Sequence, residues 1–199
     1  FIMNQPSRPR FIVGISGASG VVYGIRLLQL LRRLGVETHL VMSKSAQVTL
    51  AYESDLGVAD VRALADVTHL NSDIGAAISS GSFKVQGMIV APCSIKTMSE
   101  IAAGVTGSLL SRAADVMLKE RKRLVLMLRE TPLHLGHLRT MTAVTEAGAI
   151  VYPPVPAFYA RPQTIEQMVD HTLGRVLDLF DLDTQTVKRW DPPRNQGAE

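Results

Sequence analysis

The residues best suited to chemistry begin with a glycine-rich heptapeptide, GISGASG, which spans Gly14 to Gly20. It follows the short apolar run 11–13 and opens into a segment whose apolar residues recur at helical spacing. Glycines let the backbone approach a ligand closely, and the start of a helix offers unpaired N–H groups and partial positive charge to an anion. The pattern therefore predicts a phosphate-bearing ligand at this turn. A tight glycine turn that binds nothing is the alternative.

The glycine spacing favours a mononucleotide over a dinucleotide. Gly14, Gly17 and Gly20 do not form the G-x-G-x-x-G pattern of dinucleotide-binding folds. Those folds also place an acid at the end of the second strand, where it binds a ribose. Here the corresponding positions, 42–44, read Met-Ser-Lys and contain no carboxylate. A mononucleotide therefore fits better than NAD.

Polar residues also follow two other apolar runs. The runs 87–91 and 124–128 have the continuous hydrophobicity of buried parallel strands, and they lead to Ser94 and to the pair Arg129 and Glu130. The carboxyl ends of parallel strands are where α/β sheets bind ligands. This position favours a functional role for Arg129 and Glu130.

Charged residues also lie on a predicted helix, 109–121. Arg112, Asp115 and Lys119 are spaced so that they share one face of it. Such a face is commonly a solvated row of weak ion pairs, and it can equally belong to a binding site. The residues alone leave both interpretations open.

The elements that must position these residues alternate between strands and helices. Repeated βα units predict an α/β protein with a three-layer Rossmann-like or flavodoxin-like fold, in which helices cover both faces of a central parallel sheet. We predict strands at 11–13, 37–42, 87–91, 124–128 and 149–152, with a short one within 66–83. We predict helices at 23–34, 43–52, 55–65, 96–104, 109–121, 135–147 and 164–180. Ser43 and Thr164 are expected to cap helices, the latter with Gln167 in a capping box, and Gly148 is expected to end one.

Composition predicts one domain in a reducing compartment. The chain has 199 residues, 46% hydrophobic and 20% charged, which suits a single well-cored domain over residues 10–190. Residues 1–9 read as a tail or expression remnant and residues 191–199 as a flexible C-terminal tail. A single cysteine, Cys93, cannot form an internal disulfide and has no metal-type spacing beside it. We therefore expect a cytoplasmic protein without a metal.

Charge and hydropathy argue against two classes of partner. The formal net charge is +3, but Lys and Arg are dispersed except for the run 119–123, so nucleic-acid binding has little support. No apolar stretch approaches the ~20 residues of a transmembrane helix, so no membrane insertion is expected.

Motifs spread along the chain in order carry a family resemblance. They are GISGASG with Tyr23-Gly24, ETHLVMSK at 37–44, PCSIKT at 92–97, RAAD at 112–115, LKER at 118–121, RETP at 129–132 and PPVPAFY at 153–159. Together they resemble the UbiX family of flavin prenyltransferases over about residues 11–190. The resemblance implies a prenyl-group transferase that joins the dimethylallyl group of dimethylallyl monophosphate to N5 and C6 of reduced FMN. It also implies a metal-independent reaction, a homododecamer with active sites between subunits, and delivery of prenylated FMN to a UbiD-type decarboxylase in ubiquinone biosynthesis or aromatic acid decarboxylation.

The resemblance also assigns site residues by position. The implied FMN contacts are Gly17, Ala18, Ser19, Ser43, Ser94, Ile95, Lys96, Thr97 and Arg129. The implied contacts of dimethylallyl phosphate are Arg112, Lys119, Glu130, Tyr159 and Arg175. The implied catalytic residues are Ser19 near N5 of the flavin, Glu53, Glu130, Lys119 and Trp190. Tyr52 and Ser54, which flank Glu53, depart from the family pattern.

This set of residues suits prenyl transfer. Breaking the allylic C–O bond is eased by cations and a proton donor on the leaving phosphate, which Lys119, Arg175, Tyr159 and Glu130 can supply. Aromatic faces, here Trp190 and the flavin, stabilise a developing carbocation.

Two other functions remain as alternatives. One is a flavin-dependent decarboxylase, acting on a peptidyl or pantothenoyl cysteine or on a 4-hydroxybenzoate. The cysteine decarboxylases use an Asn-bearing motif in their second half, whereas after Ala91 this chain has only Asn195. The other is a non-catalytic carrier that hands FMN to a partner, and such a carrier would not need the phosphate-binding set.

Overall fold

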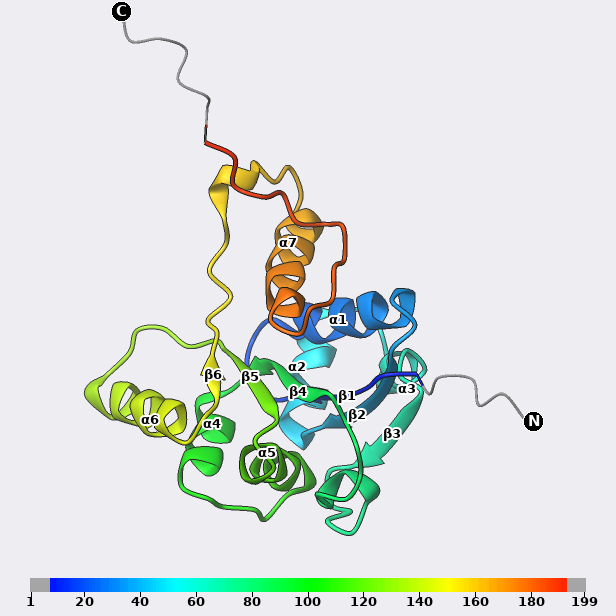
Figure 1. Cartoon of the computed structure of the whole chain (residues 1–199), viewed down its shortest axis with the longest axis vertical. Helices are drawn as coiled ribbons and strands as arrows, with labels where there is room; N and C mark the ends of the chain where they lie inside the picture. Colours follow the sequence, from blue (N-terminus) through cyan, green and yellow to red (C-terminus); the bar gives the residue numbers. More distant parts are fainter. Residues whose placement is uncertain (1–7, 193–199) are drawn as a thin grey trace, which may run out of the picture. The chain divides into compact units, whose positions relative to one another are not determined.

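The computed structural model describes residues 8–192, which form two compact units. The first unit ends at Pro154 and contains the sheet, and the second begins at Val155 (Figure 1). A single domain over residues 10–190 stays a prediction. Most of the predicted tails, together with Asn195, lie outside the described residues.

The first unit is built on a six-stranded sheet in which all neighbouring strands are parallel. The strands are β1 (Arg10–Ile15), β2 (Glu37–Met42), β3 (Val67–Leu70), β4 (Gly87–Cys93), β5 (Arg123–Leu128) and β6 (Ile150–Val151). Their order in the sheet is β3-β2-β1-β4-β5-β6. The order reverses between β1 and β4, so the loops that follow these strands turn away from each other. Such a switch point is where open α/β sheets bind ligands.

Helices cover both faces of this sheet. They are α1 (Val21–Arg33), α2 (Lys44–Glu53), α3 (Val58–Arg62), α4 (Ile95–Ala102), α5 (Leu109–Lys119) and α6 (Leu135–Glu146), with one 3-10 turn, η1 (Ala77–Ser79). Helix α1 packs on β1, β2 and β4, and α5 packs from the other side (Figure 1). Serine hydroxyls begin three helices because each accepts a hydrogen bond from a backbone N–H in the first turn. Ser43, Ser94 and Ser108 accept from Ala46, Thr97 and Ser111 at 3.1, 3.2 and 3.3 Å.

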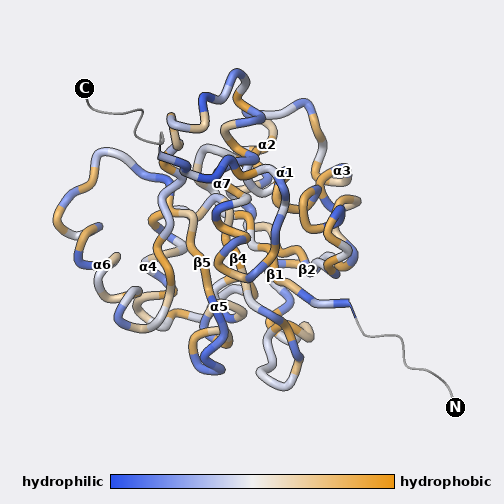
Figure 2. The backbone as a smooth tube through the Cα atoms, turned by 45° about the horizontal axis from the view of Figure 1, so that its top comes forward, coloured by the Kyte–Doolittle hydropathy of each residue, from blue (hydrophilic) through white to orange (hydrophobic). Residues whose placement is uncertain are grey.

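The core follows from the continuous apolar character of the central strands. All seven residues of β4 are buried, and only the first residue of β5 is exposed. Figure 2 shows this concentration of hydrophobic residues in β1, β4 and β5. Along one face, Ile12, Met88 and Leu126 pack in a cluster with Leu110 and Met117 of α5. The central strands are therefore anchored in the core on which their loops are built.

The second unit contains a 3-10 turn, η2 (Phe158–Ala160), and the helix α7 (Ile165–Asp178). Thr164 caps α7 by accepting from the N–H of Gln167 at 3.1 Å. The chain after α7 returns along it, and Nε2 of His171 lies 3.2 Å from the carbonyl oxygen of Lys188. A Cβ on Gly174 would lie 2.5 Å from a methyl carbon of Val187, so this contact requires glycine.

The predicted α/β fold class is confirmed, and most element boundaries shift by only a few residues. The strand predicted at 37–42 is β2, and Gly148 follows α6 with a positive φ of 111°. Strand β4 extends past residue 91 because Cys93 still pairs with Leu128 of β5. The helix expected at 55–65 is reduced to α3, and the strand expected at 149–152 is reduced to β6.

The capping box at Thr164 is incomplete, because the Gln167 side chain accepts from the N–H of Gln163 at 2.7 Å. Among the described residues, 8–192, none of the helices combines the length and the hydrophobicity that a membrane span requires.

Candidate functional site

The turn between β1 and α1 presents free backbone N–H groups. Those of Gly17, Ala18 and Ser19 make no hydrogen bond within the described chain. Gly20 completes the turn with a φ of 100°, a conformation that favours glycine. A Cβ on Gly17 would collide with Ser45, so the turn lies directly against the start of α2. This is the arrangement that binds anions at a helix start.

Glu53 already binds the first N–H groups of α1. Its Oε2 accepts from Gly20 at 2.8 Å and from Val21 at 2.9 Å, and its carboxylate also accepts from the Ser19 side chain. Burial alone would raise the pKa of Glu53, but these hydrogen bonds and the charge of Arg129 outweigh it and lower the pKa. A ligand phosphate at this turn is therefore left with the N–H groups of residues 17–19.

A buried serine joins the loops that follow β1 and β4. The Ser16 hydroxyl donates to the carbonyl of Pro92 at 2.9 Å and accepts from the N–H of Ser94 at 2.8 Å. The backbone N–H of Ser16 donates to the same carbonyl at 3.2 Å. Sequence reasoning missed Ser16, and its place inside the glycine motif was the only signal that pointed to it.

Arg129 connects the end of β5 to the glycine turn. Its backbone N–H donates to Cys93 at 3.1 Å, and Nη1 donates to the carbonyl of Ser19 at 3.2 Å. Burial raises the pKa of the nearby Tyr23, and the positive charge of Arg129 partly opposes this rise. A guanidinium charge therefore lies over the turn, where an anionic ligand would be stabilised.

The remaining implied flavin contacts lie on the same edge of the sheet. The N–H of Ser43 donates to Ile15 at 3.0 Å, and the hydroxyl of Ser94 donates to that of Thr97 at 3.1 Å. Lys96 also begins α4 on this edge, but its ammonium pairs with Glu100 and its side chain is exposed. All nine residues implied by the resemblance follow β1, β2, β4 or β5 at the carboxyl ends of these strands.

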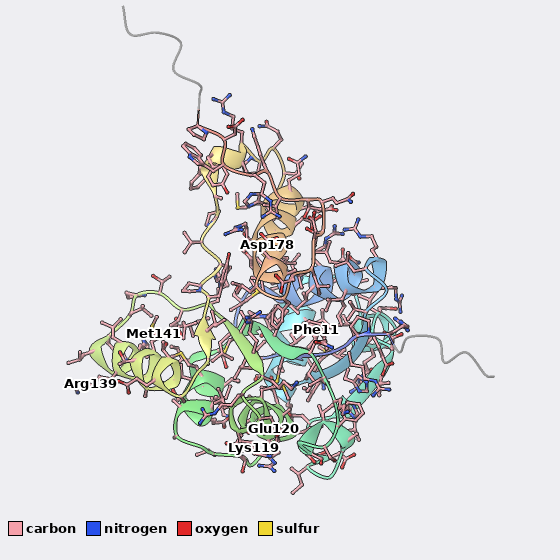
Figure 3. The ribbon with its side chains drawn as sticks, in the orientation of Figure 1. Phe11, Lys119, Glu120, Arg139, Met141 and Asp178 are labelled. Atoms are coloured by element: carbon pink, nitrogen blue, oxygen red, sulfur yellow. The ribbon has the colours of Figure 1, made fainter. Side chains whose placement is uncertain are left out.

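Within the first unit, the structure does not bring together Lys119 and Glu130, two of the residues implied to bind the prenyl phosphate. Arg112 pairs with Asp115 at 2.9 Å on α5, as a solvated helix face would. Lys119 is the last residue of α5 and pairs with Glu120 beside Gly81 (Figure 3). Since β5 begins just after it, Lys119 lies at the amino edge of the sheet, opposite the glycine turn. Crossing the six residues of β5 takes about 20 Å at roughly 3.3 Å per residue.

Glu130 lies at the carboxyl edge, beside the implied flavin contacts. Its side chain is exposed, and Oε1 accepts from the N–H of Thr131 at 3.1 Å.

Three implied site residues belong to the second unit. The rings of Tyr159 and Trp190 meet edge to face with centroids 5.5 Å apart. Arg175 donates to Asp178 at 2.6 Å, and Arg189 binds the same carboxylate. Hydrogen bonds from Arg189 and then Arg175 overcome burial and lower the pKa of Asp178. Tyr159 and Trp190 thus form one aromatic cluster, while Arg175 is held by an acid.

The residues suit a phosphate-bearing ligand and offer no activated thiol. Free N–H groups, the Ser43 and Ser45 hydroxyls and the Arg129 guanidinium meet at one edge, a donor set that fits the phosphate and polar atoms of FMN. Cys93 is free and fully buried, and burial raises its pKa far above the usual range. Residues 8–192 contain no group of three or more His, Cys, Asp or Glu that could hold a metal ion.

Comparison with known proteins gives matches over nearly the whole chain. Residues 3–184 match the family model described as Flavoprotein. The flavin prenyltransferase UbiX of Thauera aromatica is 58% identical over 181 residues, covering 91% of this chain and 93% of the relative.

Solved structures agree with the match. AnUbiX (PadA1), in complex with FMN and dimethylallyl pyrophosphate, is 55% identical with a TM-score of 0.93, covering 94% of this chain and 100% of that one. A dodecameric FMN-dependent UbiX-like decarboxylase from Escherichia coli O157:H7 is 49% identical with a TM-score of 0.89, covering 92% and 99%. The chain therefore belongs to the flavoprotein family and, within it, to the UbiX flavin prenyltransferases.

Proposed function

We propose that this chain transfers the dimethylallyl group of dimethylallyl monophosphate to reduced FMN. The allylic C–O bond breaks with its electron pair leaving on the phosphate, while N5 of the flavin bonds to the prenyl carbon and loses its proton. Protonation of the prenyl double bond then allows C6 to form the second bond and to release its own proton. The products are prenylated FMN and phosphate. The observation that carries the proposal is the free N–H row of residues 17–19 beneath Arg129, at the switch point of the sheet.

Residues of this chain divide the work between binding and charge stabilisation. The glycine turn, Ser43 and the loop 94–97 hold the flavin, which as a reduced co-substrate supplies the nucleophilic atoms. Ser19, held by Glu53, lies near N5. Lys119, Arg112 and Arg175 stabilise the leaving phosphate, since cations placed where charge develops lower the barrier.

The remaining roles belong to two aromatic residues and one acid. Tyr159 and Glu130 orient the phosphate by hydrogen bonding, and Trp190 covers the prenyl group. The ring centroids of Tyr159 and Trp190 lie 5.5 Å apart, which supports a shared role for these two residues on the same ligand.

We further propose that the site is completed by neighbouring copies in a homododecamer. Lys119 lies at the edge of the sheet opposite the glycine turn, so within one copy it cannot reach a phosphate bound near Ser19. A second copy that presents its amino edge to this carboxyl edge would supply the missing cation. The dodecameric relative from Escherichia coli O157:H7 supports this assembly.

The proposal extends to the enzyme that uses the product and to the compartment in which the reaction takes place. The product would serve a UbiD-type decarboxylase, because a modified flavin released from this site needs an enzyme that uses it. We place the reaction in the cytoplasm, where a reduced flavin and the free thiol of Cys93 are both maintained.

Mass spectrometry of the flavin tests this function directly. The protein is incubated with reduced FMN and dimethylallyl monophosphate, and a gain of one prenyl unit on the flavin is expected. Loss of carbon dioxide from a cysteine peptide or a 4-hydroxybenzoate, with the flavin unchanged, would indicate a decarboxylase. An unmodified flavin that passes to a partner protein would indicate a carrier.

A further inference from the structure

A cavity lies on the carboxyl edge of the sheet, next to Ser43 among the implied flavin contacts. It has a volume of about 440 Å³, within the usual range of ligand pockets, and is formed where β2 and β3 end. Its lining residues are Met42, Lys44, Gln47, Arg62, Thr68, His69, Leu70, Asn71, Ser72, Gly107 and Ser108. None of the residues implied to contact FMN or dimethylallyl phosphate is among them.

The cavity contains cations without partners. Neither Lys44 nor Arg62 makes a side-chain hydrogen bond or ion pair with any residue in the described part of the chain. The Nε of Arg62 is shielded from solvent and still lacks an acceptor. A buried guanidinium N–H without an acceptor is unfavourable, so this group is poised to bind one.

Other lining groups add donors and no negative charge. Leu110 donates to Oδ1 of Asn71 at 3.0 Å, which leaves the amide NH₂ of Asn71 available as a donor. None of the described lining residues is acidic. Burial, and then the charge of His39, lower the pKa of the lining residue His69, and the charge of Asp73 partly opposes this. Asp73 itself accepts from the N–H of Gly75.

We propose that this cavity binds a small phosphate-bearing anion through Arg62 and Lys44. Arginine offers a planar fork that matches the oxygens of a phosphate, and Lys44 adds a point charge in the first turn of α2. Asn71 and Gln47 supply neutral donors. The ligand is free phosphate or a small phosphomonoester, and the volume leaves room for an organic group beside the phosphate.

Calorimetric titration of the full-length chain, saturated with FMN, tests the site. Inorganic phosphate and glycerol phosphate are the two probes, and the tighter binder shows whether the ligand is free phosphate or a phosphomonoester. Arg62→Ala should weaken binding by about tenfold or more, and Arg62→Lys should recover only part, because lysine lacks the Nε donor. Arg33→Ala, which removes an exposed arginine from the last turn of α1, is the matched control and should bind as the unmodified chain does.

The same titration separates this site from the proposed prenyl-phosphate site. Arg175→Ala should leave binding at the new cavity unchanged. Phosphate binding that is lost in Arg175→Ala and retained in Arg62→Ala would overturn the proposal, as would the absence of any binding of either probe. Thermal unfolding of Arg62→Ala checks that the variant folds, and Lys44→Ala provides an independent test on another element.

Discussion

The hydroxyl of Ser16 and the backbone N–H of Ser94 are joined by a 2.8 Å hydrogen bond between residues 78 positions apart. The same hydroxyl donates to Pro92, so one buried side chain fixes the spacing of the loops that follow β1 and β4. Ser94 in turn caps α4. The loops on both sides of the switch point are therefore positioned by a residue that need not touch a ligand.

Replacing Ser16 with alanine should reduce both stability and flavin affinity. The change leaves the part-buried N–H of Ser94 without its acceptor, which costs about 1–3 kcal/mol. Chemical denaturation and FMN titration measure the two effects. Ser82→Ala, at an exposed serine, is the control. Equal stability and equal FMN affinity in Ser16→Ala and the control would contradict a positioning role.

Glu53 should contribute to stability in a pH-dependent way. Its folded-state pKa is lowered from an ordinary value of 4.5, so its contribution is fully present above that pH. The contribution is lost as the pH falls through the lowered pKa, because protonation removes the charge that faces the start of α1. Urea denaturation should show Glu53→Gln less stable than the unmodified chain at pH 7, with the gap closing in acid. A gap that widens as the pH falls would refute this assignment.

Glu130 and Lys119 should separate chemistry from binding. Glu130→Gln keeps the shape and a hydrogen-bond donor but cannot transfer a proton, so it should bind both substrates and react about 10²-fold more slowly. Lys119→Ala removes the positive charge that stabilises the bound phosphate, so this variant should also weaken binding of dimethylallyl monophosphate. Equilibrium titration and single-turnover assays measure these effects. The two roles are misplaced if Glu130→Gln fails to bind while Lys119→Ala binds normally.

Mixed assemblies test whether Lys119 serves a neighbouring copy. Sites in a random equal mixture of Lys119→Ala and Glu130→Gln chains would carry both original residues about one time in four if the residues come from different copies. We expect the mixture, after dissociation and reassembly, to regain roughly that share of activity. No recovery would argue for a site within one chain. So would light scattering that finds a fully active monomer.

The sequence predicted the elements well because their signals are local. The apolar run 87–91 identifies β4, and the serine at 43 identifies the start of α2. The contacts of Ser16 and Glu53 could not be predicted in this way, since each joins segments that meet only in the folded sheet. The position of Lys119 was also missed. Helical spacing predicted that Lys119 shares a helix face with Arg112 and Asp115. It could not predict that Lys119 lies at the edge of the sheet opposite Ser19.

The collision between Gly17 and Ser45 limits how this sequence can change over time. Any larger residue at position 17 would strike Cβ of Ser45 as well as its hydroxyl, so alanine at position 45 gives no relief. Only glycine at position 45 would open the space, and glycine there weakens the first turn of α2. Substitution at position 17 therefore depends on which residue occupies position 45. A lineage that loses the glycine of the first turn must first have accepted a poorer helix beside it.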